Sequence, residues 1–284
     1  MSVSFASTVG INFSNTFQKT PISNSQAALI TAATGTKVVK MYNYEQTDFI
    51  KDAKNAGMQV VLGIPNEKLA DLAANKATDL SAIVAVMKSY SDTVIMICVG
   101  NEPLAPWQKK AYDKTLVKAM QNVQTALEAA NVATPLTVPF NYAIMSASYP
   151  PSIGALKQGL ETIIKEVCEV IKSSGAVFMI NIYPFLDLLD NPKDVKLDYC
   201  LFTSKSVVVQ DGAYGYKNIF DASYDALSIA LTALGYGNLQ IVVGESGWPT
   251  NPTETFPNAN KTNAETFNTN LIAHCQSGKG TPRH

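Results

Sequence analysis

Residues 94–103 read VIMICVGNEP, an apolar run of six residues that ends in Gly-Asn-Glu-Pro. Such a run, rich in Val and Ile and stopped by Gly and Pro, is typical of a strand buried on both faces of a parallel sheet. Residues 239–249, LQIVVGESGWP, repeat the arrangement. Glu102 lies just past the first run, after Gly100 and Asn101, and Glu245 lies just past the second, after Gly244. In barrels of parallel strands, catalytic residues lie at the carboxyl ends of the strands.

Short runs rich in Val and Ile alternate with longer segments of helical periodicity along the chain. This alternation indicates parallel strands joined by crossover helices. In one of the helical segments, apolar residues from Leu116 to Ala130 recur at spacings of three and four, as on one face of a helix. The seven predicted strands are residues 9–13, 37–42, 59–64, 94–99, 136–140, 176–183 and 239–244.

The fold that we expect is an α/β fold of the (β/α)8 TIM-barrel type. Such barrels commonly occupy about 250 residues as one unit, and the chain has 284 residues. We therefore predict a single barrel domain over residues 1–284. The sixth and seventh runs are unusually far apart, and residues 186–216 contain turn signals such as Asp211-Gly212. They predict a small hairpin insertion between strands six and seven.

Composition narrows the range of partners. Hydrophobic residues make up 46% of the chain and charged residues 16%, and the formal net charge is −1. These values allow a large core and indicate no nucleic-acid partner. No apolar stretch reaches about 18 residues, so no membrane span is predicted. The first residues, Met1 to Phe5, lack the basic and apolar regions of an export signal, which fits an intracellular protein or a mature protein whose signal was removed.

Metal and thiol chemistry is not indicated. The four cysteines show no Cys-x-x-Cys spacing, and we interpret them as mostly buried thiols. The chain has only two histidines, so neither a zinc site nor a Ser-His-Asp triad is expected. We predict no metal and no cofactor.

Two carboxyl groups at matching strand ends can cleave an acetal. One protonates the leaving oxygen while the other supports or attacks the positive sugar centre, and in retaining enzymes the two groups stand roughly 5 Å apart. A lone glutamate in such a position is more often an ordinary solvated residue. Two glutamates in matching positions, Glu102 and Glu245, favour a catalytic pair.

Amide and aromatic residues accompany both glutamates. Asn101 could hydrogen-bond a sugar 2-hydroxyl, although an Asn that forms a turn is an equal alternative. Trp248 could offer a flat face to a pyranose ring. Tyr42, Tyr183 and Phe185 repeat the pattern of aromatic rings at the carboxyl ends of predicted strands. For each ring, packing in the core is an equal alternative.

The sequence around both glutamates is similar to that of a known family. Residues 99–102 (VGNE) and 244–249 (GESGWP) resemble the two signatures of glycoside hydrolase family 17, the β-1,3-glucanases of plants, fungi and bacteria. Further matching motifs follow in the family's order, at residues 9–12 (VGIN), 40–42 (KMY), 149–152 (YPPS), 181–185 (NIYPF), 190–192 (DNP), 218–222 (NIFDA) and 263–268 (NAETFN).

The resemblance implies a retaining, endo-acting hydrolase with Glu102 as acid/base and Glu245 as nucleophile. The implied partner is β-glucan polysaccharide, and a monomer that is secreted or located in the cell wall is expected. Two alternatives stay open: a β-1,3-glucan transglycosylase, in which a second glucan intercepts the intermediate instead of water, and an inactive glucan-binding protein. The residues implied to line the substrate cleft are Tyr42, Asn101, Tyr183, Phe185 and Trp248.

The chain departs from the family pattern in two places. Lys40 stands where family members usually carry Arg, a change that keeps the charge and loses the planar fork. After residues 280–282 the family continues into an eighth strand, whereas this sequence ends at His284. A barrel without that strand would have open edges. We therefore expect that the chain is truncated at its carboxyl end or that another segment closes the barrel.

Overall fold

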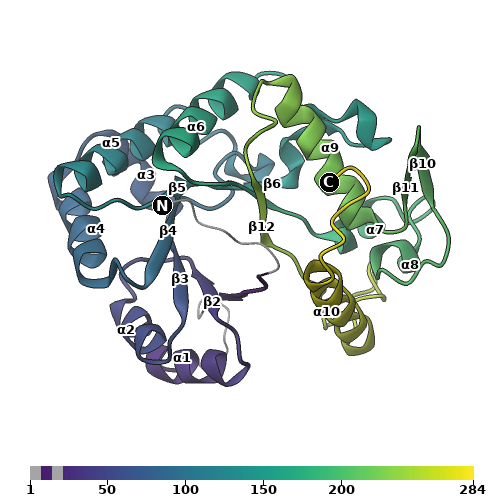
Figure 1. Cartoon of the computed structure of the whole chain (residues 1–284), viewed down its shortest axis with the longest axis horizontal. Coiled ribbons are helices and arrows are strands. Elements are labelled where there is room, and N and C mark those ends of the chain that lie inside the picture. Colours follow the sequence, from purple (N-terminus) through teal and green to yellow (C-terminus); the bar gives the residue numbers. More distant parts are fainter. Residues whose placement is uncertain (1–7, 15–21) are drawn as a thin grey trace. The chain divides into compact units, whose positions relative to one another are not determined.

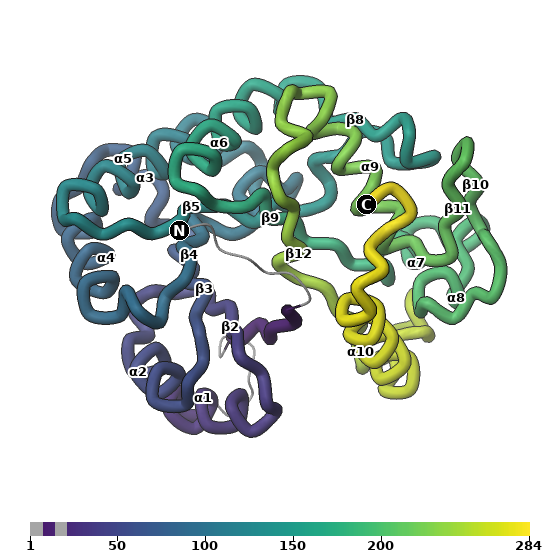
Figure 2. The backbone as a smooth tube through the Cα atoms, viewed as in Figure 1, coloured from purple at the N-terminus to yellow at the C-terminus, as the bar shows by residue number. Residues whose placement is uncertain are grey.

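The computed structural model describes residues 8–14 and 22–284, so the stretch from Met1 to Phe5 lies outside the described residues. The chain divides into two compact units. Unit 1 comprises residues 1–141 and 162–179, and unit 2 comprises residues 142–161 and 180–284. Figure 1 labels the elements, and Figure 2 follows the backbone from one end to the other. Glu102 belongs to unit 1 and Glu245 to unit 2.

Unit 1 contains a five-stranded sheet in the order β1-β2-β3-β4-β5, in which all neighbouring strands are parallel. The first four predicted strands are confirmed, and two of them have the predicted bounds. Because parallel strands end at a common edge of the sheet, the segments after Met41, Ile64 and Val99 emerge at that same edge. The strands are β1 (Ile11–Phe13), β2 (Val38–Met41), β3 (Gln59–Ile64), β4 (Val94–Val99) and β5 (Leu136–Thr137).

The fifth predicted strand, residues 136–140, is split in the structure. β5 ends at Thr137, and the short strand β6 (Pro139–Asn141) begins one residue later. Proline has no backbone N–H with which to continue a ladder, so Pro139 starts a new strand instead of extending β5. Asn141, the last residue of β6, lies just beyond the predicted strand.

Helices connect the five parallel strands of unit 1, and one further helix precedes β9 (Phe178–Asn181). The predicted apolar stripe is confirmed in α5, where Leu116, Met120, Val123 and Leu127 are buried. The helices are α1 (Asn24–Ala33), α2 (Thr47–Asn55), α3 (Leu69–Ala73), α4 (Ala77–Tyr90), α5 (Leu116–Ala129) and α6 (Glu161–Ser174), with the single 3₁₀ turns η1 (Asn66–Lys68) and η2 (Pro106–Gln108).

Unit 2 contains the strand that ends in Glu245. This strand, β12 (Ile241–Glu245), is the neighbour of β9 (Phe178–Asn181). Just past β9, Ile182 donates its backbone N–H to the carbonyl of Glu245 at 3.0 Å. The sixth and seventh predicted strands are therefore confirmed, with β9 shorter than the predicted residues 176–183.

The predicted hairpin between these two strands is also confirmed. β10 (Val209–Asp211) and β11 (Tyr214–Tyr216) pair antiparallel. A second small antiparallel pair, which the sequence did not indicate, joins β7 (Met145–Ala147) to β8 (Ala155–Leu156). The helical elements of unit 2 are α7 (Pro184–Asp190), α8 (Leu197–Cys200), α9 (Ile219–Ala233), α10 (Lys261–Gln276), η3 (Tyr142–Ile144) and η4 (Pro151–Ile153).

The residues after α10 fold back onto α9 and the hairpin. Thr281 donates its hydroxyl to the buried carboxylate of Asp225 at 2.5 Å. The guanidinium of Arg283 forms an ion pair with Asp211 at 2.8 Å. Within residues 8–14 and 22–284, β12 is the last strand along the chain. None of the helices in these two ranges is both long enough and apolar enough to cross a membrane.

Three of the four cysteines lie in the core. Cys98, Cys168 and Cys200 are buried, which confirms their interpretation as packing residues, and Cys275 is half-buried. Burial raises the pKa of Cys168 and of Cys200 to about 12. These two thiols therefore stay protonated at neutral pH and are unsuited to nucleophilic chemistry.

Candidate active site

The segment that carries Glu102 leaves β4 in an unusual backbone conformation. Gly100 has φ of 82° and Glu102 has φ of 50°, so both lie in the left-handed region. A Cβ atom on Gly100 would lie 2.7 Å from the side-chain oxygen of Asn66, so this position needs glycine. A non-glycine residue with positive φ is held there only when the surrounding contacts determine its conformation.

Asn66 supplies two of those contacts. Its side-chain oxygen accepts the backbone N–H of Asn101 at 2.8 Å, and its Nδ2 donates to the backbone carbonyl of Asn101 at 2.8 Å. On the other side of the turn, Glu102 donates its own N–H to the carbonyl of Pro139 at 2.8 Å. The Asn101–Glu102 peptide is thereby held at its carbonyl by Asn66 of η1 and at its N–H by Pro139 of β6.

The Asn101 side chain is oriented by a buried lysine. Lys40 Nζ donates to Asn101 Oδ1 at 3.2 Å and lies 4.6 Å from the centre of the Tyr42 ring. The lysine is only 6% exposed. A buried cation between an amide oxygen and an aromatic face is favourably placed. The ammonium group thus serves as a point donor to the Asn101 side chain.

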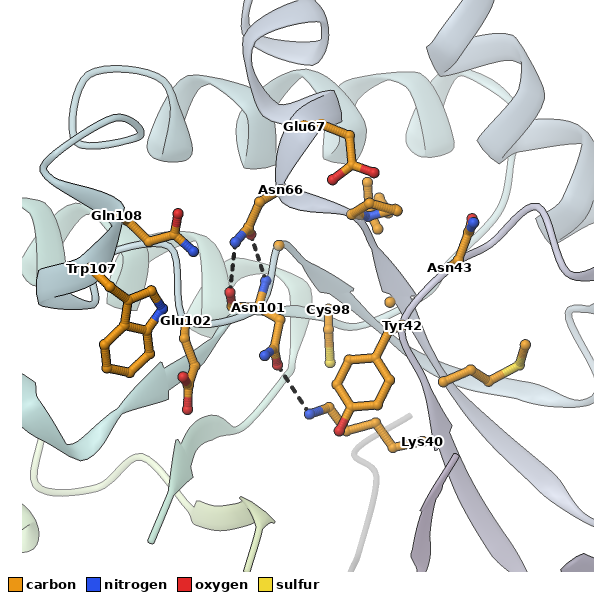
Figure 3. A pocket seen from close by; sticks show the side chains of 15 residues that line it. Lys40, Tyr42, Asn43, Asn66, Glu67, Cys98, Asn101, Glu102, Trp107 and Gln108 are labelled. Atoms are coloured by element: carbon orange, nitrogen blue, oxygen red, sulfur yellow. Dashed lines mark hydrogen bonds between the residues drawn. The ribbon is translucent and has the colours of Figure 1, made fainter. Parts of the chain in front are cut away.

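The Glu102 carboxyl group faces a cavity of about 390 Å³. Asn141 donates its Nδ2 to Glu102 Oε1 at 3.1 Å. The structure therefore brings together three predicted site residues of unit 1: Tyr42, Asn101 and Glu102 all line this cavity. Figure 3 shows Tyr42 with Lys40 on one side of Asn101, and Glu102 with Trp107 on the other side.

The Glu245 carboxyl group is held by a phenol. Tyr183 donates its hydroxyl to Glu245 Oε2 at 2.7 Å. Tyr183 is the residue directly before α7, whose first position is Pro184, and it follows β9, the neighbour of β12. Adjacent strand ends thus bring Tyr183 and Glu245 together, which are two of the predicted site residues in unit 2.

Phe185 and Trp248 connect this pair to an aromatic cluster. The Phe185 ring lies 5.7 Å from Tyr183 and 6.2 Å from Trp248, both edge-on. Trp248 is 7% exposed, packs against Phe256 and Phe267, and donates its indole N–H to the carbonyl of Asn258 at 2.9 Å. Of the two roles that the sequence left open for Trp248, the structure shows core packing; sugar contact stays a prediction.

One carboxyl group of α7 has a shifted pKa. Burial raises the pKa of Asp187, in the first turn of α7, to about 6, and the nearby Asp190 adds to the shift. Asp187 therefore changes charge in weakly acidic solution.

Sequence reasoning missed three residues of unit 1. Asn66 and Asn141 contact the Glu102 segment directly, and Trp107 lines the same cavity. The available signal was their position, because Asn66 follows the end of β3 and Asn141 ends β6 as Glu102 follows the end of β4. Within residues 8–14 and 22–284, no cluster of three or more His, Cys, Asp or Glu residues could hold a metal ion.

Carboxylates at the ends of barrel strands, accompanied by amides and aromatic rings, define the class of site that glycosidases use. Comparison with known proteins gives the family. The chain belongs to the glycosyl hydrolases family 17, whose family model matches residues 9–284.

Individual relatives agree with this assignment. The chain is 33% identical over 283 residues to the glucan endo-1,3-beta-glucosidase of Vitis vinifera, covering 98% of this chain and 80% of the relative. It is 34% identical over 252 residues to Lichenase-2 of Hordeum vulgare, covering 88% and 77%. The solved structure of CJP38, a β-1,3-glucanase and allergen of Cryptomeria japonica pollen, matches with a TM-score of 0.88 at 30% identity, covering 98% and 86%. The chain is therefore a glycosidase with the predicted (β/α)8 barrel fold.

Proposed function

We propose that this protein cleaves β-1,3-glucan at internal bonds with retention of configuration. Glu102 is the acid/base, and Glu245 is the nucleophile. The observation that supports this most directly is that the Glu102 carboxyl lines a cavity together with Asn101 and Tyr42, in a family whose members include glucan endo-1,3-beta-glucosidases. The substrate is a wall or storage polysaccharide, which fits a secreted or wall-bound enzyme.

The chemistry proceeds in two steps on this proposal. Glu245 attacks the anomeric carbon while Glu102 gives its proton to the oxygen of the leaving sugar. Glu102 then takes a proton from water, which displaces Glu245 from the sugar and restores both groups. The Tyr183 hydroxyl at 2.7 Å fixes the orientation of the attacking carboxyl group throughout.

The groups around Glu102 suit a neutral, hydroxyl-rich ligand. Asn43, Asn66, Asn101 and Gln108 line the cavity with amides, which can both donate to and accept from sugar hydroxyls. Lys40 contributes its charge to Asn101 and the Tyr42 ring. The amides thus favour a ligand with many hydroxyl groups, such as a glucan.

The test compares the wild-type protein with Glu245→Gln on three polymers: linear β-1,3-glucan, mixed-linkage β-1,3;1,4-glucan and β-1,4-glucan. We expect the wild type to release reducing ends from the first as a ladder of oligosaccharides, with β-configured products by early NMR spectra. Mixed-linkage glucan is included because Lichenase-2 of Hordeum vulgare is about as similar to this chain as the glucan endo-1,3-beta-glucosidase of Vitis vinifera is. Glu265→Gln, at an exposed position of α10, is the matched control.

Each outcome identifies one reading. Wild-type rates in Glu245→Gln would contradict the nucleophile assignment. Products longer than the substrate would identify a transglycosylase, and binding to insoluble β-1,3-glucan without any product would identify a glucan-binding protein.

A further inference from the structure

The loop between Glu102 and α5 presents an exposed tryptophan. A succession of turns follows Glu102: Ala105 donates to the carbonyl of Glu102 at 3.1 Å, and Gln108 donates to that of Ala105 at 2.9 Å. Trp107 is the middle residue of η2, which begins with Pro106. The buried Ala105 anchors the base of the turn. The loop is thus hydrogen-bonded in steps back to the catalytic segment.

The backbone just beyond Trp107 is also specified closely. Lys109 has φ of 49° and Lys110 has φ of 63°, two consecutive non-glycine residues in the left-handed region. Lys109 donates its N–H to the carbonyl of Pro106 at 3.1 Å, which closes η2. Such conformations are costly and concentrate at ligand-binding sites. They set the direction of the loop directly after the tryptophan.

Trp107 differs sharply from the other tryptophan of the chain. Its side chain is 59% exposed, whereas Trp248 is 7% exposed within the aromatic cluster of unit 2. A single exposed apolar residue needs no explanation by itself. Trp107, however, lines the same cavity as the Glu102 carboxyl group, with the neighbouring Gln108 also in the lining. Figure 3 shows the indole drawn beside Glu102.

We propose that Trp107 is a sugar-stacking residue that positions a glucosyl ring of the bound glucan next to Glu102. The inference rests on the proposed function and names a further part of its substrate site. The C–H-bearing face of a pyranose covers an indole well, because both are flat and apolar, while the ring hydroxyls point outward to groups such as Gln108 and Asn66. Trp107 is thereby a substrate-binding residue on the loop, separate from the Tyr42 side of the cavity.

The binding test uses the fact that the chain has two tryptophans. In a Glu245→Gln background, which stops turnover, acrylamide should quench the exposed Trp107 and largely spare the buried Trp248. A linear β-1,3-gluco-oligosaccharide should protect the fluorescence from acrylamide. In the same background with Trp107→Phe, the remaining emission should be blue-shifted and only weakly quenched by acrylamide, with or without the oligosaccharide.

The kinetic test separates binding from chemistry. In otherwise wild-type protein, we expect Trp107→Ala to raise KM for β-1,3-glucan by about tenfold, the scale of one good ring contact, with kcat changed less than KM. Trp107→Phe keeps a flat ring and should recover most of the loss. Leu29→Ala, which removes an exposed apolar side chain of α1, is the matched control and should leave KM unchanged.

The outcomes for Trp107 and for the proposed function are distinguishable. Oligosaccharide binding in calorimetry without protection of Trp107, or an unchanged KM in Trp107→Ala, would overturn the stacking role while hydrolysis stands. Protection of Trp107 without any hydrolysis by the wild type would overturn the proposed reaction and retain the sugar site. Absence of both binding and hydrolysis would overturn both.

Discussion

The two glutamates are held in contrasting ways. Glu245 is the last residue of a regular strand, and its carboxyl group accepts the Tyr183 hydroxyl from the end of the neighbouring strand. Glu102 lies past the end of its strand, in left-handed backbone, and its position depends on Asn66 and Asn141 from two other strand ends. The backbone hydrogen bonds of its strand position the Glu245 carboxylate. The Glu102 carboxylate, which lies past the end of a strand, needs neighbours that stabilise an otherwise unfavourable backbone conformation.

The largest expected effect tests whether Glu245 is the nucleophile. Glu245→Ala should lower kcat on β-1,3-glucan by more than about 10⁴-fold, since loss of a covalent nucleophile in other enzymes costs up to on the order of 10⁶. Azide can then attack the anomeric carbon from the vacated face of an activated β-glucoside. The product should be the α-glycosyl azide, identified by NMR. Formation of the β-azide would contradict the assignment.

Glu102→Ala tests the other half of the pair. Loss of a general acid and base should lower the rate on the polymer by about 10²- to 10⁴-fold. An aryl β-glucoside with a good leaving group needs no protonation, so its first step should be much less affected. Azide should restore turnover by intercepting the glycosyl-enzyme, and the product should be the β-azide. If both alanine variants gave the same azide anomer, the two roles would not be distinct.

Removing one hydrogen-bond donor from each carboxyl group shows how much the activity depends on that donor. The donors are Tyr183 for Glu245 and Asn141 for Glu102. Tyr183→Phe deletes one hydroxyl and keeps the ring contact with Phe185, so kcat should fall by about 10- to 100-fold, the scale of a hydrogen bond to a charged group. Asn141→Ala should cost less, because its 3.1 Å contact with Glu102 is longer and the Glu102 backbone is fixed independently. Steady-state kinetics decide the order, with Tyr214→Phe on the hairpin as control. A larger loss in Asn141→Ala would reverse the comparison.

Asn66→Ala tests whether the conformation of the Glu102 segment depends on the hydrogen bonds that Asn66 makes to its backbone. Two hydrogen bonds to Asn101 disappear, and we expect the free energy of unfolding to fall by about 1–3 kcal/mol, as for partly buried groups left unpaired. kcat/KM should fall as well, because Glu102 adjoins the released peptide. Chemical denaturation measures the first quantity, and Asn268→Ala at an exposed position of α10 is the control. Unchanged stability and activity would show that the left-handed backbone conformation at Glu102 does not depend on Asn66.

Asp187, in the helix that directly follows Tyr183, offers a pH-dependent test. Its folded pKa of about 6 lies above 3.8, the ordinary value for an aspartate, so folding favours the protonated form. Its contribution to stability is present below about pH 4 and is lost as the pH rises through 6. Asp187→Asn should therefore be more stable than the wild type by about 1–3 kcal/mol at pH 7 and nearly equal to it at pH 4. Denaturation at the two pH values measures the difference, and a difference that does not depend on pH would contradict the shift.

Much of the fold was predictable because strand formation is encoded locally. The runs at residues 59–64 and 94–99 have the predicted bounds, since a strand buried on both faces needs apolar side chains at every position. The split at Pro139 was also readable in principle, because proline interrupts a ladder wherever it falls. The hairpin followed from turn chemistry between two short strands.

The partners of the site were not predictable in the same way. Asn66 lies 35 residues before Asn101, and Asn141 lies 39 residues after Glu102. No local sequence pattern indicates that the Asn66 amide contacts the Asn101 backbone, or that the Asn141 amide contacts the Glu102 carboxyl group. The sequence likewise left Trp248 undecided between packing and sugar contact, because its ring neighbours Phe185 of α7 and Phe267 of α10 lie far from it in the chain.

By itself, the sequence determined the order of the main parallel strands, the placement of Glu102 and Glu245 at strand ends, and the similarity to one family of glycosidases. These properties depend on short-range periodicity and on residues adjacent in the chain. The tertiary structure alone decided that Asn66 and Asn141 support one glutamate and Tyr183 the other, and that one tryptophan is buried while Trp107 is exposed at the cavity. The physical reason is that hydrogen bonds and burial depend on atoms within a few ångströms in space, whatever their separation along the chain.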